Sequence, residues 1–136
     1  MDLILWRHAD AREAREGEPD ADRPLTPKGE RQAKRMAQWL NHHLPDTTKV
    51  LVSPTRRTEE TAKALDRKYK LSAQLAPDQT VDALLGTVRW PDAKEPVLVV
   101  GHQFTLGLTA AYLLAGATQP WVVRKGGIWW LRLRRR

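Results

Sequence analysis

Two short apolar runs in this chain each end on a histidine. Residues 3–6 (LILW) lead into Arg7 and His8, and residues 97–100 (VLVV) lead into Gly101 and His102. Apolar runs of this length, bounded by polar residues or glycine, predict buried strands of a parallel sheet. Ligands of open α/β sheets bind beyond the carboxyl ends of such strands, so we expect both histidines to face one crevice. One histidine after a strand is more often a capping or surface residue, and the pair is the stronger signal.

A third apolar run, residues 50–52, is followed by a Ser-Pro pair and then by Arg56 and Arg57. Proline suits the first turn of a helix, where no intrahelical donor is needed, so the arginines are expected in that turn. The helix dipole disfavours cations there, which indicates that an anion lies between the arginines and the helix end. Pairing with the glutamates that follow is the alternative, and we prefer it for Arg56.

Length and composition set further limits. A chain of 136 residues with 41% hydrophobic content predicts one domain over residues 1–136, with no separate regulatory module. The absence of cysteine excludes disulfides. The N-terminal apolar run is too short for a signal peptide or a membrane span, so a cytoplasmic location is expected. Only residues 11–23 and 77–96 are available to cover a pocket, which predicts an open site.

Helices are expected between the strands. Thr26 and Pro27 form an N-cap and first-turn pair. Apolar or small residues recur at helical spacing in three segments: Ala33, Met36, Ala37, Leu40 and Leu44; Thr61, Ala62, Leu65 and Tyr69; and Val81, Leu84, Leu85 and Val88. Residues 104–114 are apolar almost all round, which predicts a buried helix that ends at Gly116. Residues 121–123 and 128–131 are expected to form two closing strands, and residues 11–24 an irregular loop. The pattern predicts a single three-layer α/β/α domain with a mainly parallel central sheet.

Four motifs in this order resemble the histidine phosphatase superfamily, the group that includes phosphoglycerate mutases and acid phosphatases. They are the strand ending in Arg-His, Leu-Thr-Pro-x-Gly at 25–29, Ser-Pro-x-x-Arg-x-x-x-Thr-Ala at 53–62, and Gly-His-Gln at 101–103. The resemblance covers nearly the whole chain. Within the superfamily, the short length of the chain and the motifs at residues 7–11 and 101–103 most resemble the SixA-type phosphohistidine phosphatases. Two positions differ: Ala9 replaces a common glycine, and Phe104 replaces the usual proline, which is expected to shift the local backbone or to add an aromatic wall to the pocket.

The resemblance implies a role for each matching residue. His8 is the nucleophile and Arg7, Arg57 and His102 are the other catalytic residues. Ser53 and Gln103 are implied to bind substrate. These residue types suit phosphoryl transfer, because forked guanidinium donors and a protonated His102 neutralise the charge that spreads over the phosphoryl oxygens. A neutral imidazole is nucleophilic near neutral pH, and the scheme requires no metal or other cofactor.

The general acid is harder to assign, and Asp10 and Asp82 are the candidates. A phosphohistidine substrate needs less acid assistance, because imidazole leaves readily. The sequence therefore predicts a metal-independent phosphatase that works through a phosphohistidine intermediate and acts on phosphohistidine in a protein. A small-molecule phosphomonoesterase of the same fold is the alternative. A mutase is less favoured, because it needs a closed pocket that protects its intermediate from water.

The basic composition allows an alternative hypothesis, in which the protein binds nucleic acid and is not an enzyme. A net charge of +7, a pI near 10.1, six tryptophans and the terminal run at 132–136 are typical of a nucleic-acid-binding module. No binding motif accompanies the charge, and most of the tryptophans fit strand contexts, so nucleic acid is a disfavoured partner. The sequence leaves the oligomeric state open.

Overall fold

A five-stranded sheet forms the centre of the computed structural model, which describes residues 1–134. Its strand order is β3-β2-β4-β1-β5. The strands are β1 (Asp2–Arg7), β2 (Lys49–Val52), β3 (Lys70–Leu71), β4 (Val97–Gly101) and β5 (Ile128–Arg132). The first four run parallel to one another, and β5 pairs antiparallel with β1. The mainly parallel sheet is therefore confirmed, and β3 is an addition that the sequence analysis did not predict.

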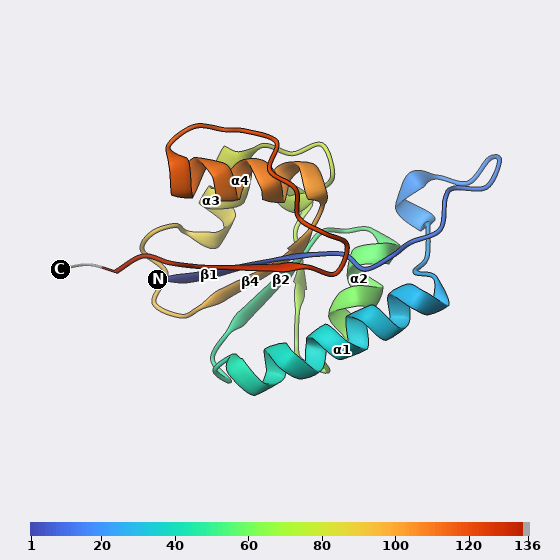
Figure 1. Cartoon of the computed structure of the whole chain (residues 1–136), viewed down its shortest axis with the longest axis horizontal. Helices are drawn as coiled ribbons and strands as arrows, with labels where there is room; N and C mark the ends of the chain where they lie inside the picture. The colour runs from blue at the N-terminus through green and yellow to red at the C-terminus, as the bar shows by residue number, and fades with distance from the viewer. Residues whose placement is uncertain (135–136) are drawn as a thin grey trace.

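Helices cover both faces of this sheet (Figure 1). On one face lie α1 (Pro27–His43) and α2 (Arg56–Lys63), and on the other lie α3 (Val81–Val88) and α4 (Gln103–Ala115). Two short 3₁₀ turns, η1 (Asp20–Asp22) and η2 (Ala73–Leu75), interrupt the loops. The three-layer α/β/α arrangement is confirmed. Within residues 1–134, no helix combines the length and the apolar character that crossing a membrane requires.

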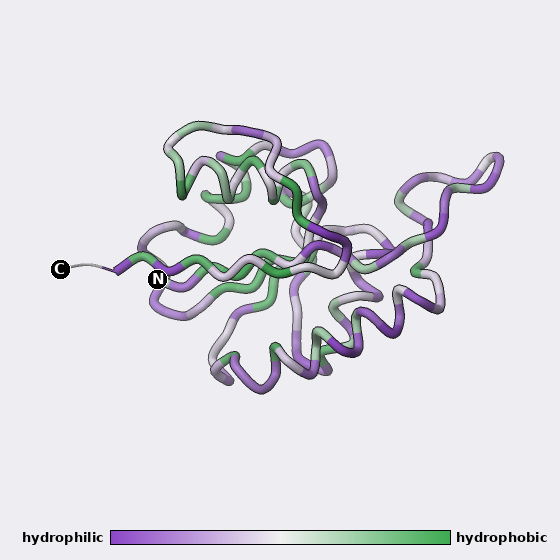
Figure 2. The backbone as a smooth tube through the Cα atoms, viewed as in Figure 1, coloured by the Kyte–Doolittle hydropathy of each residue, from purple (hydrophilic) through white to green (hydrophobic). Residues whose placement is uncertain are grey.

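Alternation along β1 explains why the sheet needs helices on both faces. Leu3 and Leu5 pack among side chains of α3 and α4, whereas Ile4 and Trp6 pack among those of α1 and α2. All four side chains are fully buried. Successive residues of a strand point to opposite faces, so a continuous apolar run is buried on both. Figure 2 shows the apolar residues as green stretches in the central strands and in the helices of one face, α3 and α4, whereas α1 on the other face is mostly purple.

Threonine side chains begin three of the helices. Thr26 accepts a hydrogen bond from Gly29 at the start of α1, and Thr80 caps α3 in the same way. The glycine is required there, because a Cβ on Gly29 would collide with the backbone carbonyl of Asp10. At α2 the cap is Thr55, so the proline before it lies outside the helix and not in its first turn. The arginines nevertheless occupy the first turn as predicted.

The expected strand at residues 121–123 is absent, and this segment runs as a loop beside the first two turns of α4, against Gln103 and Gly107. Its backbone groups have partners other than a neighbouring strand: the Val123 N–H donates to Gln103, and the Val123 carbonyl accepts from Arg7. Val122 is largely exposed. The backbone N–H and carbonyl of Val123 therefore form hydrogen bonds with side chains and not with a neighbouring strand, although valine favours strands.

The sequence analysis also overestimated the length of one helix and the burial of another. The helix after Arg57 ends at Lys63, and the chain then turns through Asp66 at φ +53°, so Tyr69 is not part of it. The helix of residues 104–114 exists and ends at Gly116, but it is not buried all round. Phe104 is 63% exposed, and the face that it shares with Tyr112 is open.

Candidate active site

The register of the sheet brings the two histidines together. Arg7 of β1 lies opposite Gly101 of β4, so His8 and His102 leave the sheet at the same level. The His8 N–H donates to the Gly101 carbonyl at 3.0 Å. The two rings lie 5.5 Å apart, centroid to centroid, and both side chains are buried. The two histidines therefore lie next to each other at the carboxyl edge of the sheet, as predicted.

His8 is held in one tautomer. Its Nδ1 lies 2.8 Å from the Ala9 carbonyl, which can only accept, so Nδ1 carries the proton and the Nε2 lone pair is free. Burial lowers the His8 pKa to about 4, and the positive charges of Arg57 and Arg7 add to this effect. The ring is therefore neutral at physiological pH, as a nucleophile must be.

His102 is also neutral when no anion is bound. Burial first, and then the charge of Arg57, lower its pKa to about 3. Its Nε2 lies 2.8 Å from the Ser53 hydroxyl, and its Nδ1 faces Arg57 Nη2 at 3.5 Å. Because a guanidinium only donates, Nδ1 is the acceptor in this contact and the proton is on Nε2. The protonated His102 expected from the sequence is thus not the state of the free site.

Two arginines flank the histidines, and a backbone carbonyl anchors the Nη1 atom of each. Arg7 Nη1 donates to the Val123 carbonyl at 2.8 Å, and Arg57 Nη1 donates to the Asp20 carbonyl at 2.9 Å. The Nε atoms of both arginines are buried and have no hydrogen-bond partner in the described chain. Buried unpaired donors are costly, so this pair of guanidinium groups favours an anion between them.

The adjacent arginines differ sharply in exposure. The Arg57 side chain is 4% exposed, whereas that of Arg56 is 55% exposed and pairs with Glu60 at 3.4 Å. Neighbouring residues on a helix point about 100° apart, so only one of them reaches the site. The predicted distinction between the two is present in the structure.

Sequence reasoning missed Asp20. Its carboxylate lies 3.0 Å from Arg57 Nη2 and also pairs with Arg23 at 2.9 Å. Partial burial raises the Asp20 pKa, but the charges and hydrogen bonds of the two arginines lower it by more. The sequence offers little to single out Asp20, because the polar loop of residues 11–24 contains several acidic residues and no motif distinguishes one of them.

Ser53 and Gln103 hold the site together. The buried Ser53 hydroxyl fixes the His102 ring. The Gln103 side chain donates to the Trp121 carbonyl at 2.7 Å and accepts from the Val123 N–H at 2.6 Å. It therefore fixes the loop whose Val123 carbonyl anchors Arg7. Both side chains are engaged within the protein, although the resemblance implied that they bind substrate.

Neither candidate general acid, Asp10 or Asp82, forms a hydrogen bond or ion pair with His8 or His102 in the described chain. Asp10 accepts from the Thr26 hydroxyl at 2.7 Å and from Lys125 at 3.1 Å. The hydrogen bond from Thr26 lowers the Asp10 pKa, burial opposes this, and Lys125 lowers it further, so the group stays ionised. An ionised carboxylate is a poor proton donor.

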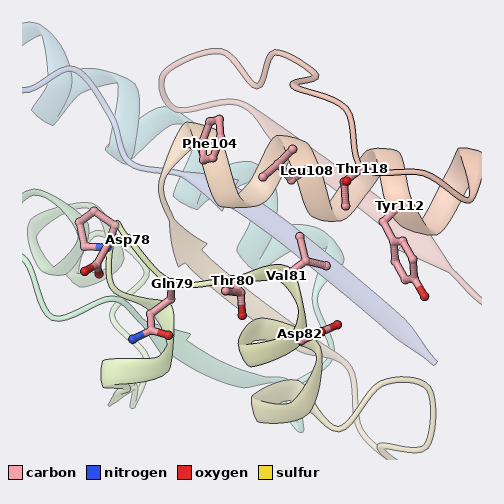
Figure 3. A pocket seen from close by; sticks show the side chains of 10 residues that line it. Asp78, Gln79, Thr80, Val81, Asp82, Phe104, Leu108, Tyr112 and Thr118 are labelled. Carbon is pink, nitrogen blue, oxygen red and sulfur yellow. The ribbon is translucent and has the colours of Figure 1, made fainter.

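Asp82 lines a separate cavity of about 460 Å³ between the start of α3 and α4 (Figure 3). Phe104, Leu108 and Tyr112 form its apolar wall, and neither histidine lines it. Phe104 therefore contributes its aromatic ring to this neighbouring cavity. Its N–H belongs to the first turn of α4, which begins as a regular helix directly after His102.

In this fold Arg7 ends β1 and is followed by His8, and Gly101 ends β4 and is followed by His102. The family model of the histidine phosphatase superfamily (branch 1) matches residues 3–80, and the chain belongs to this superfamily. It is accordingly a phosphatase, and the expected family membership is confirmed.

Three relatives show how far the similarity extends. An uncharacterised protein of Picosynechococcus is 35% identical over 97% of this chain and 85% of its own length. The phosphohistidine phosphatase SixA of Escherichia coli is 32% identical over 88% of this chain and 78% of its own length. The solved structure of the protein histidine phosphatase SixA complexed with tungstate is 28% identical, with a TM-score of 0.73, and covers 92% of this chain and 84% of that one.

The burial of the two helix arginines predicts unequal effects on catalysis. Arg57→Ala should lower kcat/KM by about 10²–10³-fold, the scale for losing one preorganised donor. Arg56→Ala removes an exposed ion pair and should cost less than about fivefold. Steady-state kinetics on p-nitrophenyl phosphate measures both. Equal losses in the two variants would contradict the assignment of Arg57 to the site.

The lowered pKa values predict an unusual titration. In the free protein, His8 and His102 should remain neutral at pH about 5.5, where an unperturbed imidazole is mostly protonated. Ring ¹⁵N chemical shifts measure this directly, and urea-unfolded protein, in which both pKa values return to about 6.5, is the control. Saturating tungstate should raise the His102 pKa, because an anion stabilises the charged ring. A native midpoint near 6.5 for either ring would show that burial does not control its protonation.

Proposed function

We propose that this protein hydrolyses phosphohistidine on a protein substrate, with His8 as the nucleophile. The observation that carries the proposal is the tautomer of His8, whose Nδ1–H is committed to the Ala9 carbonyl and whose Nε2 lone pair is free beside His102. A fixed, neutral imidazole within a cluster of cations is suited to attack a negatively charged phosphoryl group.

The reaction proceeds in two displacements. His8 Nε2 forms a bond to phosphorus, the P–N bond of the substrate histidine breaks, and the departing imidazole nitrogen takes up a proton from water. Water then attacks phosphorus, and the bond to His8 breaks with its electron pair returning to Nε2, so that His8 is again neutral. Orthophosphate leaves with the protons of the attacking water and gives one to the hydroxide that the first step produced. Each step moves charge among three equatorial oxygens, which the cations must stabilise.

Arg7 and Arg57 provide that stabilisation through their unpaired Nε edges. His102 contributes in a second way. Its ring is neutral in the free site, and a bound phosphoryl dianion raises its pKa, so the ring can take up a proton as the anion enters. In this scheme the three groups neutralise the anion and no metal takes part.

Two observations support phosphohistidine as the substrate. The relatives include proteins named as phosphohistidine phosphatases, and this chain is 32% identical to one of them. In addition, Asp10 and Asp20 both have lowered pKa values, while Asp82 lines the separate cavity. Neither ionised carboxylate suits the protonation of an alkoxide, whereas imidazole departs without strong acid assistance.

A small-molecule phosphomonoesterase is the second candidate. The cavity beside Phe104 is the observation in its favour, since a volume of about 460 Å³ is within the range of small-ligand pockets and Phe104 follows His102 by two residues. The two candidates differ in their need for an acid, which a substrate comparison can measure.

The proposed leaving group predicts that acid variants remain active. Asp10→Asn and Asp82→Asn should each change the hydrolysis of a phosphohistidine peptide by less than about tenfold, because protonation of the leaving group is not limiting. A true general acid would cost about 10²–10⁴-fold on alkyl phosphates and spare p-nitrophenyl phosphate. Rates of the wild type and both variants on the three substrates separate these cases.

The decisive comparison is the alkyl phosphate. We expect the wild type to hydrolyse it far more slowly than the phosphohistidine peptide. Rapid alkyl phosphate turnover that one Asn variant abolishes would identify a general acid and establish a metabolite phosphatase in place of the proposed enzyme.

A further inference from the structure

The loop of residues 11–24 contacts Arg57 of the active site through Asp20. Asp20 approaches Arg57 with two acceptors at once: its backbone carbonyl accepts from Nη1 at 2.9 Å, and its carboxylate accepts from Nη2 at 3.0 Å. No other carboxylate in the described chain forms an ion pair with Arg57. In Figure 1 this loop extends beyond the sheet, at the end where β1 and β4 finish.

The two contacts occupy one edge of the guanidinium. A guanidinium has an end edge, formed by Nη1 and Nη2, and a side edge, formed by Nε and Nη2. Asp20 fills the end edge. On the side edge, Nε is buried without a partner and Nη2 lies 3.5 Å from His102 Nδ1. Nε is therefore the donor of Arg57 that remains unpaired and available to an anion beside His102.

Arg7 resembles Arg57 in having a paired Nη nitrogen and an unpaired Nε. Its Nη1 donates to the Val123 carbonyl, and its Nε is also buried and unpaired. Both arginines are thus anchored through their Nη nitrogens, and the Nε of each has no partner in the described chain. The anchors differ in character, because Val123 belongs to a segment fixed by Gln103, whereas the Asp20 side chain is 62% exposed.

We propose that Asp20 is a positioning residue that turns the Nε edge of Arg57 toward the phosphoryl group. This inference rests on the proposed function of the same site, and it adds a residue that the sequence analysis did not single out. Asp20 holds the guanidinium and does not touch the reacting atoms. Forked donors lose much of their value when they are misdirected, because bidentate geometry is specific.

The loop is built to hold Asp20 in place. Arg23 donates to the second carboxylate oxygen at 2.9 Å, and it also donates to the Arg12 carbonyl at 3.0 Å. Arg12 in turn forms a two-bond ion pair with Glu18 at 2.6 and 2.7 Å. This chain of contacts fixes the carboxylate even though much of it is exposed.

A competing role for Asp20 makes the opposite prediction. If its carboxylate were a resident anion that phosphate must displace, removing it would strengthen anion binding. If it positions Arg57, removing it weakens anion binding. The sign of the change therefore distinguishes the two roles.

The test compares Asp20→Ala, Asp20→Asn and Asp22→Ala in the full chain, with tungstate and orthophosphate affinities measured by calorimetry. Asp20→Ala should weaken both by about tenfold, the scale of one charge-assisted hydrogen bond. Asp20→Asn should recover most of the affinity, because an amide oxygen can still accept from Nη2. Asp22→Ala is the matched control, since Asp22 lies on the same η1 turn and is not paired with Arg57. Unchanged or tighter binding in Asp20→Ala would overturn the proposal.

A double-mutant cycle separates positioning from loss of the loop structure. In an Arg57→Ala background, Asp20→Ala should have no further effect on tungstate affinity, because the residue it positions is gone. An additive loss would show that Asp20 acts independently of Arg57 and would also overturn the proposal. These binding measurements need no turnover, so they remain decisive if the wild type fails to hydrolyse phosphohistidine, an outcome that would refute the proposed function alone.

Discussion

The parallel pairing of β1 with β4 is the constraint on which the rest of the site depends. In this register the last residue of each strand is opposite the other, and the His8 N–H donates to the carbonyl of Gly101. A shift by one residue would turn every side chain of β1 to the other face of the sheet. Because both faces of β1 are buried by helices, the core fixes the register, and the register fixes the distance between the histidines.

Electrostatics then gives this arrangement its chemistry. Burial keeps both histidines neutral while two arginines beside them remain charged. In the absence of an anion, the positive charge of the site is therefore only partly neutralised, and the Nε atoms of both arginines have no hydrogen-bond acceptor in the described chain. An incoming phosphoryl group meets donors that are already in place, so little reorganisation is needed during transfer.

Much of this site could be predicted from the sequence, for a physical reason. His8, His102 and Arg57 follow apolar runs within a few residues, and the carboxyl ends of parallel strands converge at one edge of a sheet. Asp20 could not be found in this way, because it lies in a polar loop whose path depends on two ion pairs, Arg12 with Glu18 and Arg23 with Asp20 itself.

The errors in the fold have similar causes. The segment at 121–123 has strand-forming residues, but its backbone is held by the side chains of Gln103 and Arg7, which local periodicity does not reveal. The exposed side of α4 was mistaken for core, because an apolar composition does not say which face is covered. The role of Arg135 and Arg136 in the basic C-terminal run lies outside the described residues.

The most direct test of the account is a rapid-quench experiment with a ³²P-labelled phosphohistidine peptide. The account predicts acid-labile, base-stable label on the protein within the first turnover, located at Nε2 of His8 by mass spectrometry and absent from His8→Ala. Wild-type turnover by His8→Ala, or label on another residue, would contradict the central claim that His8 is the nucleophile.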